Sequence, residues 1–253
     1  DIGIAMGIRG TEVAKESSDM IITDDNFATI VGAVEQGRVI VENILRFIHY
    51  LFSCNFAEIL TVFVAIMIGW PLPIGVLQIL WLNLVTDIFP ATALALEPSA
   101  QDVMRRPPRD PSAPLMTPRF GWLIVWQGGV VATCTLAAFG FGLRAYGVEG
   151  EGLRHAVTIA FMALSRTEVA HVFNARSTTR SMFSTGGATN RWLWGATLLC
   201  LGLQLSAVAV PLLRRVLRTT PLTLSDWGVV LAAALTPVVV VELVKGGARW
   251  RNR

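Results

Sequence analysis

Charged side chains are scarce in this sequence. Asp, Glu, Lys and Arg make up 15% of its 253 residues, whereas a soluble domain carries roughly 25%. Hydrophobic residues make up 53% of the chain, and its mean hydropathy is +0.55. This composition excludes an ordinary soluble enzyme and indicates a chain whose solvent is largely lipid.

Lysine is nearly absent, with Lys15 and Lys245 as its only occurrences, so arginine supplies most of the net charge of +3. The arginines lie between apolar runs, as they do in the positively charged loops of membrane proteins. No basic stripe interleaved with aromatic residues accompanies them. The sequence therefore argues against a nucleic-acid partner.

Cysteine and histidine are also sparse, with three of each. The cysteines (Cys54, Cys134 and Cys200) fall in apolar runs, and their odd number and wide spacing exclude a disulfide framework and a zinc knuckle. The histidines lack the spacing of metal ligands. The chain begins at Asp1 without a signal peptide, and we interpret it as a piece of a longer protein.

The chain has two parts that differ in their pattern of apolar residues. In residues 1–40, DIGIAM and DMIIT are short strand-like runs, and TEVAKESS between them predicts a helix capped by Thr11. From about residue 40 the apolar runs become long enough to cross a bilayer, which takes roughly 20 helical residues. The predicted fold is mainly α: a bundle of six transmembrane helices after a short α/β segment. The spans are predicted at 47–69, 76–96, 120–143, 156–173, 192–213 and 227–244.

Six spans return the C-terminus to the side of the N-terminus. The second and fourth connections and the C-terminal tail are rich in arginine, so the positive-inside rule places both termini in the cytoplasm. The connection with Arg214, Arg215 and Arg218 would then lie outside, and we interpret it as an exception to that rule.

Polar side chains deep in a membrane helix are costly and usually functional. In the first span, Asn55 and Glu58 are three residues apart and share a helix face. In the second, Asn83, Thr86 and Asp87 share another face. WPLPIG allows only a tight turn between these spans, and a rise of about 1.5 Å per residue puts Glu58 and Asp87 at nearly the same depth.

Pro90 follows this second group. Because proline has no N–H, it cannot bond the carbonyl of Thr86, and we expect a kink and a freed carbonyl there. Carboxylate, amide and carbonyl oxygens are ligands for hard cations such as Ca²⁺. The sequence therefore predicts a cation site. The alternative is that these residues only bond one another and hold the two helices together.

Glu168 lies in the fourth span, with Arg166 and His171 close by. Its expected position near the cytoplasmic end favours a local ion pair or a solvated side chain over a cation ligand.

Four segments of the chain carry a resemblance to a known family: DIGIAMGIRGTEVAKESSDMIITDDNFATIVGAVEQGR (1–38), SCNFAEIL (53–60), LQILWLNLVTDIFPATALALEP (77–98) and DVMRRPPR (102–109). They resemble the type II P-type ATPases, in particular their calcium-pump-like bacterial branch. It implies that residues 1–40 close a HAD-like phosphorylation domain and begin the stalk, and that 41–253 form the C-terminal membrane domain. It also implies that Asn55, Glu58, Asn83, Thr86 and Asp87 bind the transported cation, with Ca²⁺ favoured.

The resemblance further implies an aspartyl-phosphate cycle driven by ATP and Mg²⁺ in an intact parent, in a bacterial plasma membrane, with protons as possible counterions. The DKTG and GDGxND motifs and the PEGLP-type segment are absent from this chain. The family's eighth-helix acid aligns with Ala160, so the resemblance does not extend to a complete second cation site.

Two other classes of function remain open. One is a non-enzymatic cation channel or secondary transporter built around the same polar helices, although a channel has no need of the α/β start. The other is a purely structural membrane bundle.

Overall fold

The computed structural model describes residues 2–98, 102–110, 112–177 and 190–251. The chain divides into two compact units. One comprises 1–42 and 98–111, and the other comprises 43–97 and 112–253.

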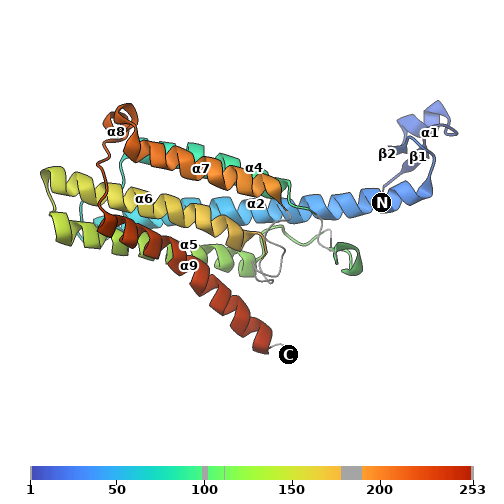
Figure 1. Cartoon of the computed structure of the whole chain (residues 1–253). Helices are drawn as coiled ribbons and strands as arrows, with labels where there is room; N and C mark the ends of the chain where they lie inside the picture. Colours follow the sequence, from blue (N-terminus) through green and yellow to red (C-terminus); the bar gives the residue numbers. More distant parts are fainter. Residues whose placement is uncertain (1, 99–101, 111, 178–189, 252–253) are drawn as a thin grey trace. The chain divides into compact units, whose positions relative to one another are not determined.

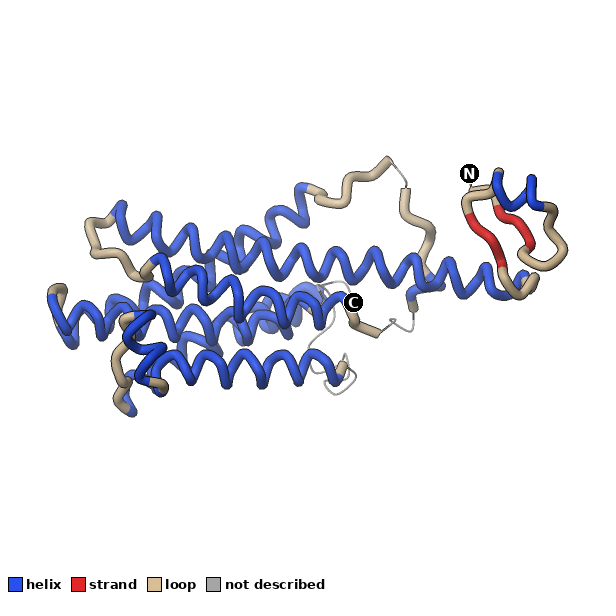
Figure 2. The backbone as a smooth tube through the Cα atoms, turned by 90° about the horizontal axis from the view of Figure 1, so that it is seen from above, coloured by secondary structure: helices blue, strands red, loops and turns tan. Residues whose placement is uncertain are grey.

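The smaller unit contains the predicted α/β segment. Strands β1 (Ile4–Met6) and β2 (Met20–Ile22) pair in parallel, with helix α1 (Glu12–Glu16) between them in the chain (Figure 2). Thr11 caps α1 by accepting a hydrogen bond from the Ala14 N–H, which confirms the predicted helix start.

The second piece of this unit, 98–111, packs against the first part of helix α2 (Phe27–Met67). It contains the short 3₁₀ helix η2 (Val103–Arg105). Arg38 donates to the carbonyls of Val103 and Arg106 at 2.9 and 2.7 Å, and the Arg106 guanidinium contacts Glu42 at 2.6 Å. The boundary expected at residue 40 leaves this piece with the membrane part. The structure groups it with the N-terminal unit because these contacts join segments more than 60 residues apart.

Helix α2 is continuous over 41 residues, so the first predicted span is only its second part. Asn26 begins it by accepting a hydrogen bond from the Ala28 N–H.

Among the described residues, six helical segments are long and apolar enough to cross a membrane, which confirms the predicted number of spans. The protein is an integral membrane protein built mainly of helices. The segments after α2 are α3 (Val76–Leu82) continued by η1 (Asn83–Asp87) and α4 (Ile88–Ala95), then α5 (Pro118–Tyr146), α6 (Gly150–Ala175), α7 (Arg191–Ala209) and α9 (Leu224–Arg251).

The fifth span is shorter than expected. Helix α7 ends at Ala209, and Pro211 begins the separate short helix α8 (Pro211–Leu217), which contains Arg214 and Arg215. Proline is well tolerated at the first position of a helix but breaks a helix interior, so the chain turns there.

Helix α6 is the most enclosed segment of the larger unit. It packs against α5, α9, α7 and α4, and its run alongside α5 and α9 is visible in Figure 1. Gly142 of α5 permits the close approach of α5 to α6, because a Cβ there would come within 2.7 Å of the Ala156 backbone. Gly128 does the same against α2, where a Cβ would come within 2.8 Å of the Ser53 carbonyl. Small residues at such crossings are typical of membrane helix pairs.

Candidate cation site

The polar residues predicted on α2 and on the following span come together in the larger unit. The Asn55 amide donates to the Asp87 carboxylate at 3.2 Å and to the Leu51 carbonyl at 2.9 Å. Glu58 and Asp87 are 6% and 8% exposed, and their carboxyl groups are close enough to interact electrostatically. The two acids therefore belong to one buried polar cluster between α2 and the following helical segment.

The other two predicted residues flank these acids. Thr86 is fully buried and its hydroxyl donates to the Leu82 carbonyl at 2.6 Å. Asn83 lies beside Glu58. Its Oδ1 is buried and accepts no hydrogen bond from the described residues. All five residues thus line one region, although Asn55 is also exposed.

The backbone between α3 and α4 is a π-helix, η1, where the sequence predicts a kinked α-helix. Pro90 removes the donor that an α-helix would offer to Thr86, and a wider turn is one way to accommodate that loss. The Thr86 carbonyl accepts a hydrogen bond from the Tyr50 hydroxyl at 2.7 Å, and the Val85 carbonyl accepts one from the Cys200 thiol at 3.0 Å. The expectation of a free carbonyl ligand at Thr86 is therefore wrong for this conformation, because side chains from α2 and α7 bond these groups.

Glu168 of α6 joins the same cluster, although its neighbours in the sequence predict a different role. It is fully buried, lies against Thr86 and is close enough to Glu58 and Asp87 to interact with both electrostatically. Neither carboxylate oxygen has a hydrogen-bond partner among the described residues. The prediction of a local ion pair or a side chain solvated by bulk water is wrong, because Glu168 is fully buried and forms no ion pair with a basic side chain among the described residues.

Ala160 of α6 is the residue that the resemblance aligns with the family's eighth-helix acid. It is a packing residue. It is fully buried in an apolar cluster with Phe139 and Leu143. A signal in the sequence could have identified Glu168 as part of a buried polar row. Glu168, His171 and Asn174 follow one another at intervals of three residues, which places them at neighbouring positions on the helix.

The site combines carboxylates from three helices with amide and hydroxyl oxygens. Hard cations such as Ca²⁺ prefer six to eight oxygen ligands of these types. Among the described residues, no three Asp, Glu, His or Cys side chains are gathered tightly enough to hold a metal ion. A cation held here in this conformation would therefore need the amide and hydroxyl oxygens as well as the carboxylates.

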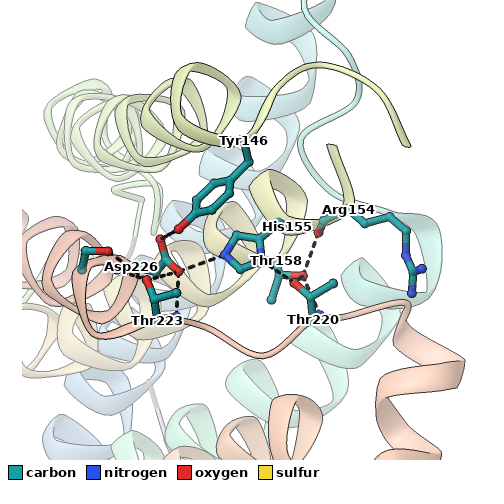
Figure 3. A network of polar contacts seen from close by, with 8 residues as sticks. Tyr146, Arg154, His155, Thr158, Thr220, Thr223 and Asp226 are labelled. Atoms are coloured by element: carbon teal, nitrogen blue, oxygen red, sulfur yellow. Dashed lines mark hydrogen bonds and ion pairs between the residues drawn. The ribbon is translucent and has the colours of Figure 1, made fainter. Parts of the chain in front are cut away.

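A second buried acid, Asp226, lies where α5, α6 and α9 meet (Figure 3). Its Oδ1 accepts from the Tyr146 hydroxyl at 2.9 Å, and its Oδ2 contacts His155 Nε2 at 2.9 Å. The backbone N–H and hydroxyl of Thr223 both donate to Oδ2 at 2.7 Å. His155 Nδ1 in turn lies 3.0 Å from the Thr220 hydroxyl. With every oxygen engaged by protein donors, this network fixes helix ends and is a poor cation site.

Comparison with known proteins identifies the family of this chain. A family model described as the C-terminus of cation-transporting ATPases matches residues 71–246. The chain belongs to this family.

Two relatives come from Bacillus. The chain is 42% identical over 257 residues to "Calcium-transporting ATPase 1" of Bacillus cereus, with 97% of this chain and 29% of the relative covered. It is 41% identical over 241 residues to "Calcium-transporting ATPase" of Bacillus subtilis, with 95% and 27% covered.

A third relative, "Probable cation-transporting ATPase F" of Mycobacterium bovis, is 38% identical over 248 residues, with 95% of this chain and 26% of the relative covered. The chain therefore spans under a third of the length of these three relatives.

Proposed function

We propose that this chain is the C-terminal membrane portion of an ATP-driven cation pump, and that Ca²⁺ is the transported cation. The observation that carries the proposal is the electrostatic proximity of three buried carboxyl groups, Glu58, Asp87 and Glu168, which come from three different helical segments. Buried acids that lack basic partners are costly in lipid and are usually retained for ion binding. The family and the printed names of the relatives favour a pump for calcium.

In this proposal Asn55, Glu58, Asn83, Thr86 and Asp87 bind the cation, and Glu168 adds a further carboxylate. The part of the protein upstream of this chain would bind ATP and Mg²⁺ and carry the phosphorylated aspartate. Residues 1–40 would complete the phosphorylation domain, and the first part of α2 would transmit its motion to Glu58. Both termini would lie in the cytoplasm at a bacterial plasma membrane. Protons would replace the cation on the return step.

The test uses the protein as its gene encodes it, in membrane vesicles. Asp87→Asn removes one negative charge but keeps the size of the side chain, so phosphorylation by ATP that depends on Ca²⁺ should be lost. Glu168→Gln should lower the apparent affinity for Ca²⁺ by at least about tenfold, which corresponds to the roughly 1.4 kcal/mol of one charge-assisted contact.

Glu151→Gln is the matched control, because Glu151 is an exposed acid of the same helix as Glu168 and should leave both measurements unchanged. Normal phosphorylation of the Asp87→Asn variant with unchanged affinity would contradict the assignment. Uptake of cation that proceeds equally without ATP would instead favour the channel or secondary transporter, and absence of any cation binding would favour a structural bundle.

A further inference from the structure

A row of buried polar side chains continues from Glu168 along α6. Glu168, His171 and Asn174 are spaced by three residues, so successive members occupy neighbouring positions on the helix. All three are fully buried. None of their side-chain nitrogen and oxygen atoms has a hydrogen-bond partner in the part of the chain that the structure describes.

His49 of α2 faces this row. Its ring lies 5.6 Å from the ring of His171, centroid to centroid, in an edge-on arrangement. One nitrogen, Nε2, is 2.9 Å from the Gln127 Oε1, whereas Nδ1 is buried and has no partner among the described residues. Tyr50 stacks on His171, with the two ring centroids 6.3 Å apart. Although the rings of His49 and His171 are in edge-to-face contact, Nδ1 of His49 and both ring nitrogens of His171 have no hydrogen-bond partner among the described residues.

The two ends of the row differ in charge. At one end lie the carboxylates of Glu58 and Asp87, which interact with Glu168. At the other end the Lys245 ammonium of α9 donates to the main-chain carbonyl of Asn174 at 3.1 Å and lies 3.6 Å from Glu242. The row therefore links the candidate cation site with the C-terminal end of α6.

Buried polar groups without partners are expensive, at roughly 1–3 kcal/mol each, and in native proteins nearly all of them are bonded to protein or to ordered water. The chemistry of this row distinguishes between possible ligands. Imidazole and carboxamide groups each present both donors and acceptors, and a metal cation satisfies acceptors only. Water both donates and accepts, and internal waters typically make about three hydrogen bonds.

We propose that Glu168, His171, Asn174 and His49 hold a file of internal water molecules that joins the candidate cation site to the C-terminal end of α6. Such a file gives water a route to and from the carboxylates through the interior of the bundle. The inference goes beyond the proposed pump function and does not depend on it, because it rests on unpartnered atoms that any function of this bundle would have to accommodate.

The experiment is X-ray radiolytic hydroxyl labelling of the purified protein in lipid nanodiscs, read by mass spectrometry. Radicals formed from internal water oxidise adjacent side chains that bulk solvent does not reach. His49 and His171 should be labelled several-fold more than Phe139 and Phe161, which are equally buried but are surrounded by apolar groups. Labelling of the two histidines at the level of the two phenylalanines would overturn the proposal.

A variant tests whether the file is continuous. Asn174→Leu keeps a similar volume but removes both polar atoms, so labelling of His171 and His49 should fall several-fold. Ser165→Ala is the matched control, because the Ser165 hydroxyl already donates to the Met162 carbonyl and lies on the same helix. Unchanged labelling in folded Asn174→Leu would also overturn the proposal. If that variant fails to fold, the comparison of histidine with phenylalanine labelling in the unaltered protein tests the proposal by itself. Neither measurement uses ATP or Ca²⁺, so its failure is distinguishable from failure of the pump assignment.

Discussion

Glu168 and Asp226 are two acids with equal burial and opposite surroundings. Both are fully buried, and both lie on helices of the larger unit. Asp226 is engaged by Tyr146, His155 and Thr223, whereas neither oxygen of Glu168 has a protein partner among the described residues. Burial alone therefore does not distinguish a structural acid from a functional one.

The difference lies in what each carboxylate can still bind. The lone pairs of Asp226 are used by donors from three neighbouring segments, so replacing it would leave those donors unpaired. The lone pairs of Glu168 remain available to exchangeable ligands such as water or a cation. A carboxylate that contributes stability and one that contributes function can thus be separated by the sign of the stability change when each is replaced.

The largest expected effect is at Asp226. Asp226→Ala should lower the free energy of unfolding by about 3–5 kcal/mol, because a charged partner is removed while buried donors remain. Denaturant titration in detergent micelles measures this change. Tyr146→Phe is the control and should cost only about 1 kcal/mol, since it removes a single hydrogen bond to the same carboxylate. A change below about 0.5 kcal/mol for Asp226→Ala, the range of an ordinary surface substitution, would mean that the network contributes little.

A smaller effect of opposite sign is expected at Glu168. Glu168→Met keeps a similar length and removes the buried charge without depriving any protein donor of its partner. The free energy of unfolding should stay the same or rise by about 1 kcal/mol, since replacing a buried charged group with a well-packed apolar one is often neutral or stabilising. The same denaturant titration applies. A loss above about 2 kcal/mol, typical of lost core interactions, would show that Glu168 is a structural acid after all.

The smallest effect concerns an acid in water, Asp25 in the N-terminal unit. Its carboxylate accepts from the Ile8 N–H at 2.9 Å and the Arg9 N–H at 2.8 Å. The bond from Ile8, followed by that from Arg9, lowers the pKa of Asp25 below its ordinary value of 3.8. A lowered pKa in the folded state means that the stabilisation is complete above the unfolded value and is lost as the pH falls through the folded one.

Amide exchange at Ile8 and Arg9, corrected for intrinsic rates, should therefore become less protected as the pH falls below about 4. In Asp25→Asn this pH dependence should disappear, because the amide oxygen does not titrate in this range. Equal pH dependence in both proteins would assign the effect to another acid.

Much of the architecture followed from the sequence. The strands around Thr11 were predicted from short apolar runs and a capping residue, and the structure confirms them. The number of spans followed from long apolar runs, because helix length must match the thickness of the bilayer. The grouping of Asn55 and Glu58 on one helix and of Asn83, Thr86 and Asp87 on the next needed only helical periodicity. Their role as cation ligands stays a prediction.

What the sequence left undecided depends on neighbours distant in the chain. Pro90 predicts a kink but does not specify the π-helix η1 at Asn83–Asp87. The partner of the Thr86 carbonyl is Tyr50, 36 residues away in the chain. The role of Glu168 was predicted wrongly because its local neighbours, Arg166 and His171, indicated an ion pair, whereas tertiary packing buries the acid near Glu58 and Asp87.

The sequence by itself determined that this protein is a membrane bundle with acids inside it, because hydropathy and periodicity are local properties of the chain. Only the tertiary structure decided which acid is bonded and which is left without a protein partner. Partners come from other helices, and no spacing within one helix specifies what will pack against it.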